Sequence, residues 1–265
     1  MNLGAMHNTP GDVGSYGLLY QWGRKDPFPA APTLTGTTAT VGAPIYDGDD
    51  NEIKITNSSQ SSTADNNLAF AIANPTVCLS NYAQFNTSRD WLQADMSNDA
   101  LWGNPKGAER NETNDFLNKG AKSFYDPCPV GWRVPPADVF RNFTASGGYA
   151  WVIDDFDIAD ISGDGAKSLA DYDYGWTFNL SDSASSYFPA AARFDGSYAM
   201  LMGSMSGLWG SYWGNAPYPG DMFQGGAYSV LSFQIKDTAG NEMITTSPAG
   251  GGARADAYSV RCIRE

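Results

Sequence analysis

The chain has 265 residues, a formal net charge of −13, 17% charged residues and 13% aromatic residues. This length is enough for a core that needs neither a metal nor many disulfides, and the aromatic content argues against a disordered chain. The acidic balance and the lack of a Lys/Arg cluster in the sequence argue against nucleic acid as a partner, because nucleic-acid binding depends on clustered basic residues.

The sequence contains no run of 18 apolar residues, so we expect no transmembrane segment. The first residues, MNLGAMHNTPGDVG, lack the basic region and the apolar stretch of a signal peptide. Two interpretations remain open: a cytoplasmic protein, or an exported one whose leader and upstream domains have been removed. The only histidine is His7, which weakens any mechanism that needs a histidine base or a His-ligated zinc.

In the first part of the chain, GLLYQW (residues 17–22) predicts a short strand that ends before Asp26-Pro27. Residues 31–67 are rich in Thr, Ser, Gly and Asn, which predicts a long surface loop insertion. The alternation in NEIKIT (51–56) predicts a hairpin within it. Arg24 and its neighbours follow the first strand, and we interpret them as a solvated turn rather than a recognition patch.

A helix is predicted in residues 135–148, PPADVFRNFTASGG. Proline opens the segment, Val139, Phe140 and Phe143 recur on one face, and two glycines end it.

After residue 170 the pattern changes to short aromatic strands separated by glycine turns, which predicts an antiparallel sheet. The predicted strands lie in GWTFNL, SYFPAAAR, GLWGSYWGN, AYSVLSFQI and AYSVRCIRE. Helices mostly in the first half and sheet mostly in the second predict an α+β fold class in a single domain, residues 1–265.

Three cysteines are present, Cys78, Cys128 and Cys262. They allow one disulfide and one free thiol, or three buried reduced thiols, and the sequence does not fix the connectivity.

A set of motifs occurs in a fixed order along the chain: NLGA, GLLYQWGRKDPFP, NPTV, DWL, LWG, YDPCPVGWRVPP, SYFPAAARFDG, GSYWG and SVRCIRE. This ordered set resembles a family of surface proteins from gut Bacteroidetes. The family includes a paralogous domain that is abundant in Fibrobacter. It also includes the C-type lectin-like C-terminal domains of Bacteroides lipoproteins and fimbrial tip proteins.

The resemblance implies a C-type lectin-like fold, with short helices packed on twisted antiparallel sheets and long loops. It also implies that Cys128 pairs with Cys262, and a disulfide fits an oxidising exterior. We therefore expect an extracellular location on the outer-membrane surface of a bacterium. Family members have residues before NLGA, whereas here Met1 directly precedes it, so we expect a domain excised from a longer exported protein.

DISGDGAKSLAD, residues 160–171, fits a twelve-residue calcium loop. Oxygen ligands would come from Asp160, Ser162, Asp164 and Asp171, and Gly165 would allow the sharp turn. Asp at the last position in place of Glu weakens bidentate binding. The alternative is an acidic, glycine-containing surface loop. Calcium is the one cofactor that the sequence suggests.

The stretch LWGSYWGNAPYPGDMF (208–223) is the candidate ligand-binding segment, because flat aromatic faces suit sugar rings and protein partners. Tyr212 and Trp213 are predicted to lie in the core. The candidate ligand-binding residues are Trp209, Asn215, Tyr218 and Asp221, of which the last three are predicted to be exposed. Sugar-binding C-type lectins carry Glu-Pro-Asn or Gln-Pro-Asp and a Trp-Asn-Asp. None of these tripeptides occurs here, which argues against the standard calcium-bridged sugar site.

The sequence contains no GxSxG, HExxH or phosphate loop, and we expect no enzyme activity. We expect a non-catalytic extracellular binding or adhesion module of a surface lipoprotein or fimbrial tip. Its partner would be a glycan, a protein or another pilus subunit. One alternative is a calcium-dependent carbohydrate-binding protein. Another is an enzyme similar to the formylglycine-generating enzymes, which need a pair of cysteines near the C-terminus where this chain has only Cys262.

Overall fold

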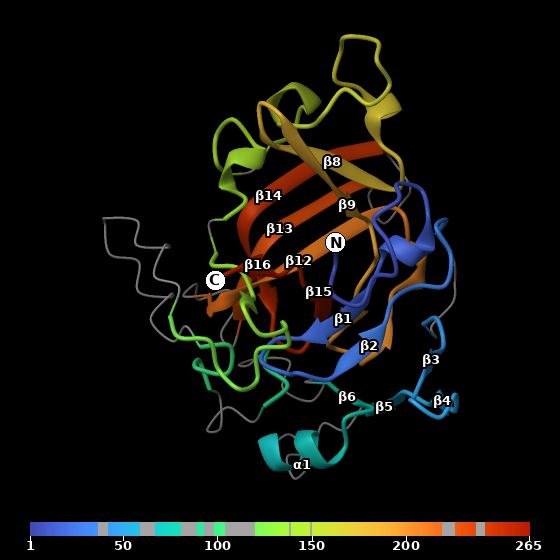
Figure 1. Cartoon of the computed structure of the whole chain (residues 1–265), viewed down its shortest axis with the longest axis vertical. Coiled ribbons are helices and arrows are strands. Elements are labelled where there is room, and N and C mark those ends of the chain that lie inside the picture. The colour runs from blue at the N-terminus through green and yellow to red at the C-terminus, as the bar shows by residue number, and fades with distance from the viewer. Residues whose placement is uncertain are drawn as a thin grey trace.

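The computed structural model describes residues 1–36, 42–58, 67–80, 89–92, 98–103, 120–137, 139–148, 150–218, 226–236 and 242–265. An eight-stranded sheet runs through the middle of the molecule (Figure 1). Its strands are β1 (Leu18–Gln21), β2 (Pro27–Pro29), β10 (Phe194–Asp195), β11 (Met200–Leu201), β12 (Trp209–Pro217), β13 (Gly226–Lys236), β14 (Glu242–Ala253) and β15 (Ala257–Ser259).

The three-residue strand β15 joins the two ends of the chain inside this sheet. It pairs antiparallel with β1 on one side. On the other side it pairs antiparallel with β10 through Ala257 and parallel with β12 through Ser259. The long strands β12, β13 and β14 then follow one another as antiparallel neighbours. This mixed arrangement brings β10, which follows the buried alanines that begin at Ala190, next to β15 near the end of the chain.

Strand β14 is the last strand of the sheet, and its sequence fits that place. Pro248 lies opposite Leu231 of β13, and proline is tolerated at a sheet edge because it cannot donate a ladder hydrogen bond. Three glycines follow it, Gly250 to Gly252. A Cβ on Gly252 would lie 2.8 Å from the Tyr258 ring and 3.0 Å from Trp213, so glycine lets these rings lie against the strand.

Within the described residues, four two-stranded sheets lie around the large one. Three are antiparallel: β3 (Ile45–Tyr46) with β4 (Glu52–Ile53), β7 (Trp132–Arg133) with β16 (Ile263–Arg264), and β8 (Gly175–Ser181) with β9 (Ala184–Pro189); β5 (Thr56–Ser58) with β6 (Val77–Leu79) is parallel. The β3–β4 hairpin confirms the hairpin predicted in the loop insertion at 31–67. The strands predicted after residue 170 are confirmed in β8, β9, β12, β13, β15 and β16.

The predicted α+β class is wrong, because the described chain is mostly β. Its only α-helix is α1 (Leu68–Ala73), at the bottom of the molecule in Figure 1, and it is too short to cover a sheet. The other helical elements are single 3₁₀ turns: η1 (Val13–Ser15), η5 (Arg141–Phe143), η6 (Ile153–Asp155), η7 (Leu169–Asp171) and η8 (Gly203–Met205). None of the helices in the described part of the chain is long and apolar enough to span a membrane.

The helix predicted at 135–148 forms only the turn η5. Phe140 and Phe143 are buried as predicted, but Val139 is 38% exposed, so the apolar positions do not form one helical face. The segment is about ten residues long between its prolines and glycines and contains Asn, Thr and Val, which are weak helix formers. Tertiary packing of the two rings therefore determines its conformation.

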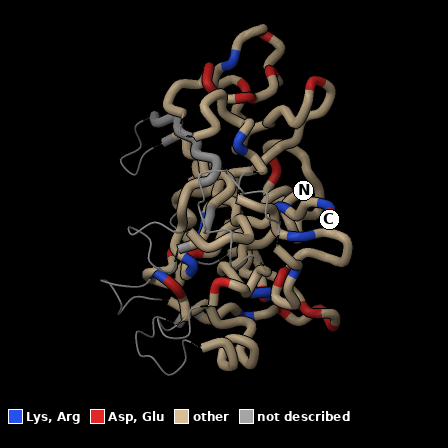
Figure 2. The backbone as a smooth tube through the Cα atoms, turned by 90° about the vertical axis from the view of Figure 1, so that its left-hand side faces the viewer, with Lys and Arg blue, Asp and Glu red and all other residues tan. Residues whose placement is uncertain are grey.

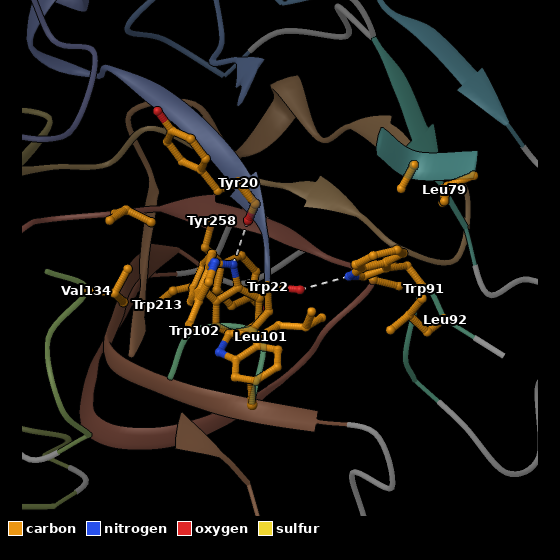
Figure 3. Packing of buried hydrophobic residues seen from close by; sticks show 14 of the residues in the cluster. Tyr20, Trp22, Leu79, Trp91, Leu92, Leu101, Trp102, Val134, Trp213 and Tyr258 are labelled. Carbon is orange, nitrogen blue, oxygen red and sulfur yellow. Dashed lines mark hydrogen bonds between the residues drawn. The ribbon is translucent and has the colours of Figure 1, made fainter. Parts of the chain in front are cut away.

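The described core is rich in aromatic rings. One cluster, shown in Figure 3, packs Trp22, Trp91, Trp102 and Trp213 together. Three of the indole N–H groups donate to buried backbone carbonyls: Trp22 to the carbonyl of Gly214 at 2.9 Å, Trp91 to that of Trp22 at 2.8 Å, and Trp213 to that of Tyr20 at 2.7 Å. These bonds satisfy the polar edge of each ring while its faces stay in apolar contact.

A disulfide joins Cys128 to Cys262, with an S–S distance of 2.01 Å, and this is the pairing that the family resemblance implies. Cys128 lies in the tryptophan cluster, and Cys262 immediately precedes β16, which pairs with β7. The ammonium of Lys122 donates to the carbonyls of Cys128 and Pro129, which fixes the turn before β7. Cys78 is a free, fully buried cysteine.

Candidate functional site

The candidate site is centred on Trp209, at the start of β12, and on Arg193, which directly precedes β10. The guanidinium of Arg193 lies 4.6 Å from the centroid of the Trp209 ring, a cation–π distance. The indole N–H of Trp209 donates to the hydroxyl of Ser232 on β13 at 3.1 Å. Both Trp209 and Ser232 are half-buried, so the indole is fixed in position and still reaches solvent.

Two carboxylates flank the guanidinium. Nη2 of Arg193 lies 3.8 Å from Oδ2 of Asp195, and Nη1 lies 3.6 Å from Oδ2 of Asp256. The hydroxyl of Tyr258 donates to the same Asp256 oxygen at 2.8 Å. The side chains of Arg193 and Asp195 are each 20% exposed, whereas that of Asp256 is 11% exposed. We call these five residues, Arg193, Asp195, Trp209, Asp256 and Tyr258, the Arg193 site.

The backbone before Arg193 is strained. Ala192 has φ = +62°, a left-handed conformation that costs a non-glycine residue on the order of 1–2 kcal/mol. Its N–H donates to the carbonyl of Trp209 at 3.0 Å, and the carbonyl of Arg193 accepts from Met202 at 2.8 Å. The strain therefore occurs where the chain turns from the buried run at 190–192 to place Arg193 over the indole.

A tight turn after β10 holds both carboxylates. The N–H of Ser197 donates to Oδ1 of Asp195 at 2.8 Å, and the N–H of Gly196 donates to Oδ1 of Asp256 at 2.8 Å. A Cβ on Gly196 would lie 2.4 Å from the backbone of Ala255, so only glycine allows this turn to approach the C-terminal segment.

The electrostatics of the site follow from its partial burial. Burial raises the pKa of Asp256, while Arg193 and the Gly196 N–H oppose that shift. Burial lowers the pKa of Arg193. Tyr258, Asp256 and Asp195 together raise this pKa by more than burial lowers it, so the net shift is upward. Burial also raises the pKa of Tyr258. Near neutral pH the guanidinium is charged and the tyrosine hydroxyl is protonated.

The structure separates the residues that the sequence predicted as one binding segment. Trp209 starts β12 and Tyr218 directly follows its end, on the order of 25 Å further along the strand. Tyr218 is half-buried, and its ring lies against Gly251 of β14. Asn215 is fully buried, and its N–H donates to the carbonyl of Pro135 at 2.9 Å. The prediction that Asn215 is exposed is wrong, and Asp221 lies outside the described residues.

The prediction that Tyr212 and Trp213 belong to the core is confirmed, since both are fully buried. The ring of Tyr212 packs against Phe188 at 5.3 Å, and its hydroxyl donates to the carbonyl of Pro189 at 2.7 Å. Among the described residues of the aromatic segment, only Trp209 contributes to the Arg193 site.

In the predicted calcium loop, the acidic side chains accept hydrogen bonds from the loop's own backbone. Asp160 accepts from the N–H groups of Gly163 and Gly165 at 2.7 and 2.9 Å. Asp171 accepts from those of Ser162 and Ser168, each at 2.9 Å. Asp164 accepts from Ala166 at 2.8 Å. These bonds explain the composition of the loop structurally. The described residues contain no group of three or more His, Cys, Asp or Glu side chains placed to hold a metal ion, and the calcium site stays a prediction.

Figure 2 shows acidic residues on the loops at the top of the molecule, which include this segment. The loop and the Arg193 site belong to different elements: the loop precedes β8, and the site is built on β10, β12 and β15. In the described part of the chain, no hydrogen bond or ion pair joins Asp160 or Asp171 to the residues of the site.

The sequence pattern did not predict Arg193, Asp195, Asp256 or Tyr258 as site residues. Their signal was present in two short segments, AAARFDG (190–196) and ARADAYS (253–259), each of which places an arginine two residues before an aspartate among small residues. Charged residues in otherwise small, apolar segments favour a buried ion pair. That the two segments meet could not be read from the sequence, because it depends on the pairing of β10 with β15.

The comparisons do not assign the chain to a family. A scan against protein-family models gives no match, and searches of curated proteins and of solved structures give none either. The geometry of the Arg193 site and the motif resemblance are therefore the two supports for a functional proposal.

Proposed function

We propose that this chain is a non-catalytic binding module of an exported bacterial surface protein, and that it holds a glycan at the Arg193 site. The observation that carries the proposal is the half-buried Trp209 ring, fixed by Ser232 and stacked with Arg193, beside the partly exposed Asp195. An aromatic face next to charged donors and acceptors is suited to a sugar ring, which has apolar C–H faces and polar hydroxyl edges.

Two further features support the proposal. The disulfide between Cys128 and Cys262 fits a protein that folds in an oxidising compartment. The ordered motifs resemble those of surface lipoproteins and fimbrial tip proteins. On this resemblance alone, we propose that the module is part of a lipoprotein or a fimbria.

A catalytic role has less support at this site. The two carboxylates flank a guanidinium and are held by backbone N–H groups, so their oxygens stabilise the turn as well as Arg193. The formylglycine-generating alternative needs a cysteine pair, whereas Cys262 is bonded to Cys128 and Cys78 is buried.

The test is a glycan-array screen with residues 1–265, followed by calorimetry on the glycans that bind. We expect at least one glycan to bind, Trp209→Ala to weaken binding at least tenfold, and Trp209→Phe to weaken it less. The matched control is Tyr46→Ala, which removes an exposed aromatic residue of β3 and should change nothing. Circular dichroism establishes that each variant is folded.

The outcomes separate the candidates. An array with no binding glycan, or equal binding by wild type and both Trp209 variants, would contradict the proposed site. Repeating the assay with a chelator tests the calcium-dependent alternative, since loss of binding on chelation would assign the activity to a bound calcium ion instead.

A further inference from the structure

The hydrogen-bonding groups of the Arg193 site indicate which glycans it takes, an inference that rests on the proposed function. Nη2 of Arg193 and Oδ2 of Asp195 are 3.8 Å apart, which is an ion-pair distance but too long for a hydrogen bond. The other Asp195 oxygen, Oδ1, already accepts from the N–H of Ser197. The site thus places a donor beside an acceptor, each with hydrogen-bonding capacity left, on side chains that are 20% exposed.

A pair of neighbouring hydroxyl groups matches this arrangement. A hydroxyl group can both donate and accept, so one can accept from Arg193 while the next donates to Asp195. Hydrogen bonds to charged partners are stronger than those between neutral groups, which favours this mode of contact. The guanidinium of Arg193 covers one face of the Trp209 indole, so the C–H face of a sugar held in this way would pack on the part of the ring that stays exposed.

The charge of the site disfavours an acidic sugar. Arg193 contributes +1, and Asp195 and Asp256 contribute −1 each, so the formal sum over these three residues is −1. The whole chain has a net charge of −13, which adds a repulsive field for anions. Arg193 is already flanked by two carboxylates, and a third carboxylate or a sulfate would compete with them and lie close to Asp195.

We infer that the Arg193 site binds a neutral sugar through two adjacent hydroxyl groups and discriminates against sugars that carry a carboxylate or a sulfate. Trp209 provides the stacking surface, Arg193 the donor and Asp195 the acceptor. Asp256 and Tyr258 position the guanidinium from the buried side.

The experiment compares matched neutral and acidic probes on wild-type protein. The probes are galactose- and mannose-terminated oligosaccharides, the galacturonate-terminated counterpart of the first, and a sulfated galactose oligosaccharide. We expect at least tenfold tighter binding to a neutral probe than to its acidic counterpart. Equal or tighter binding of the acidic probes would overturn the inference and leave the proposed glycan-binding function intact, whereas an absence of binding to every probe and array glycan would contradict both.

A pair of variants tests the role of Asp195. Asp195→Asn and Asp182→Asn each remove one negative charge, but Asp182 is exposed in the turn between β8 and β9. We expect Asp195→Asn to weaken binding of the neutral probe about tenfold or more and to reduce the ratio of its affinity for the neutral probe to that for the acidic probe. Asp182→Asn should bind both probes as the wild type does. Equal effects of the two variants would overturn the specific role of Asp195. The wild-type comparison does not depend on either variant folding.

Discussion

The ring of Tyr258 stacks on the indole of Trp213, with ring centroids 4.1 Å apart and planes inclined by 20°. Figure 3 shows the two rings side by side within the tryptophan cluster. The hydroxyl of the same tyrosine donates to Asp256 and also lies 3.4 Å from Nη1 of Arg193. One side chain therefore connects the packed core to the candidate binding site, where it contacts both Asp256 and Arg193.

Removing the hydroxyl of Tyr258 tests this connection. Tyr258→Phe keeps the stacked ring but takes the donor away from Asp256, a residue that is 8% exposed. We expect the free energy of unfolding to fall by about 1–2 kcal/mol, because a buried acceptor loses a hydrogen bond. Urea denaturation followed by circular dichroism measures the change.

The control for Tyr258→Phe is Tyr46→Phe, since Tyr46 is 59% exposed and should tolerate the loss of its hydroxyl. If the two variants were equally stable, the bond between Tyr258 and Asp256 would contribute little to folding. Weaker glycan binding by Tyr258→Phe at unchanged stability would instead assign the hydroxyl a positioning role toward Arg193.

A second buried ion pair lies in the tryptophan cluster. Arg254 donates to Asp90 at 3.1 Å, with side chains 4% and 1% exposed, and its guanidinium lies 4.4 Å from the Trp22 ring. Arg254→Met would leave Asp90 without its cation in the core. We expect a loss of about 3–5 kcal/mol in the free energy of unfolding, because an uncompensated buried charge is costly.

The exposed pair between Lys54 and Glu52 provides the contrast. Its atoms are 2.8 Å apart, but the side chains are 78% and 45% exposed, so Lys54→Met should cost less than about 0.5 kcal/mol. Denaturation midpoints of both variants in urea give the comparison. If Arg254→Met lost little free energy of unfolding, solvent or another cation would have to compensate the charge of Asp90.

The predictions from the sequence succeeded where a local pattern determines structure. The aromatic alternation of β8, β12 and β13 predicted strands, and the burial of Tyr212 and Trp213 followed from their place within one of them.

The failures come from contacts between residues far apart in the sequence. Arg24 was predicted in a solvated turn, yet it is 2% exposed and donates to the carbonyls of Val77 and Pro75, near the end of α1. Asn215 was predicted to be exposed, yet it is fully buried, and its N–H donates to the carbonyl of Pro135, 80 positions earlier in the chain. The α+β prediction failed for a related reason, since short apolar segments such as 135–148 were assigned as helix before their packing partners were known.

The loop at 160–171 gives a prediction that depends on pH. Burial raises the pKa of Asp171, but the N–H groups of Ser162 and Ser168 and further donors lower it by more, so the net shift is downward. A carboxyl group whose pKa is lower in the folded state stabilises the protein above its unfolded pKa of about 4, and this stabilisation disappears as the pH falls through the folded value.

We therefore expect Asp171→Asn to reduce the free energy of unfolding by about 1–2 kcal/mol at pH 7, because one oxygen acceptor becomes an amide donor facing an N–H group. The difference in the free energy of unfolding between wild type and Asp171→Asn should stay constant from pH 8 to about pH 5 and shrink below about pH 4. Asp164→Asn is the control, since that carboxylate is exposed and accepts a single backbone hydrogen bond, from the N–H of Ala166, within the described residues. If this difference in the free energy of unfolding grew on acidification, it would contradict the downward pKa shift of Asp171.

The three cysteines should behave as two chemically distinct groups. The disulfide joins residues 134 positions apart, so the double variant Cys128→Ala/Cys262→Ala should lose about 4–5 kcal/mol on the chain-entropy account of disulfide stabilisation. Cys78→Ala removes one small buried group and should cost about 1 kcal/mol. Urea denaturation of the two variants under the same conditions measures this contrast.

Thiol labelling tests the same assignment without a substitution. Burial raises the pKa of Cys78 to about 12, so at pH 8 its thiol is both protonated and inaccessible, and the thiolate is the reactive form. The native protein should take up no label, the unfolded protein one label, and the unfolded and reduced protein three. Peptide mapping should place the single label on Cys78. Two or three labels without reductant would mean that Cys128 and Cys262 are not joined, and the argument for an oxidising compartment would then lose its structural support.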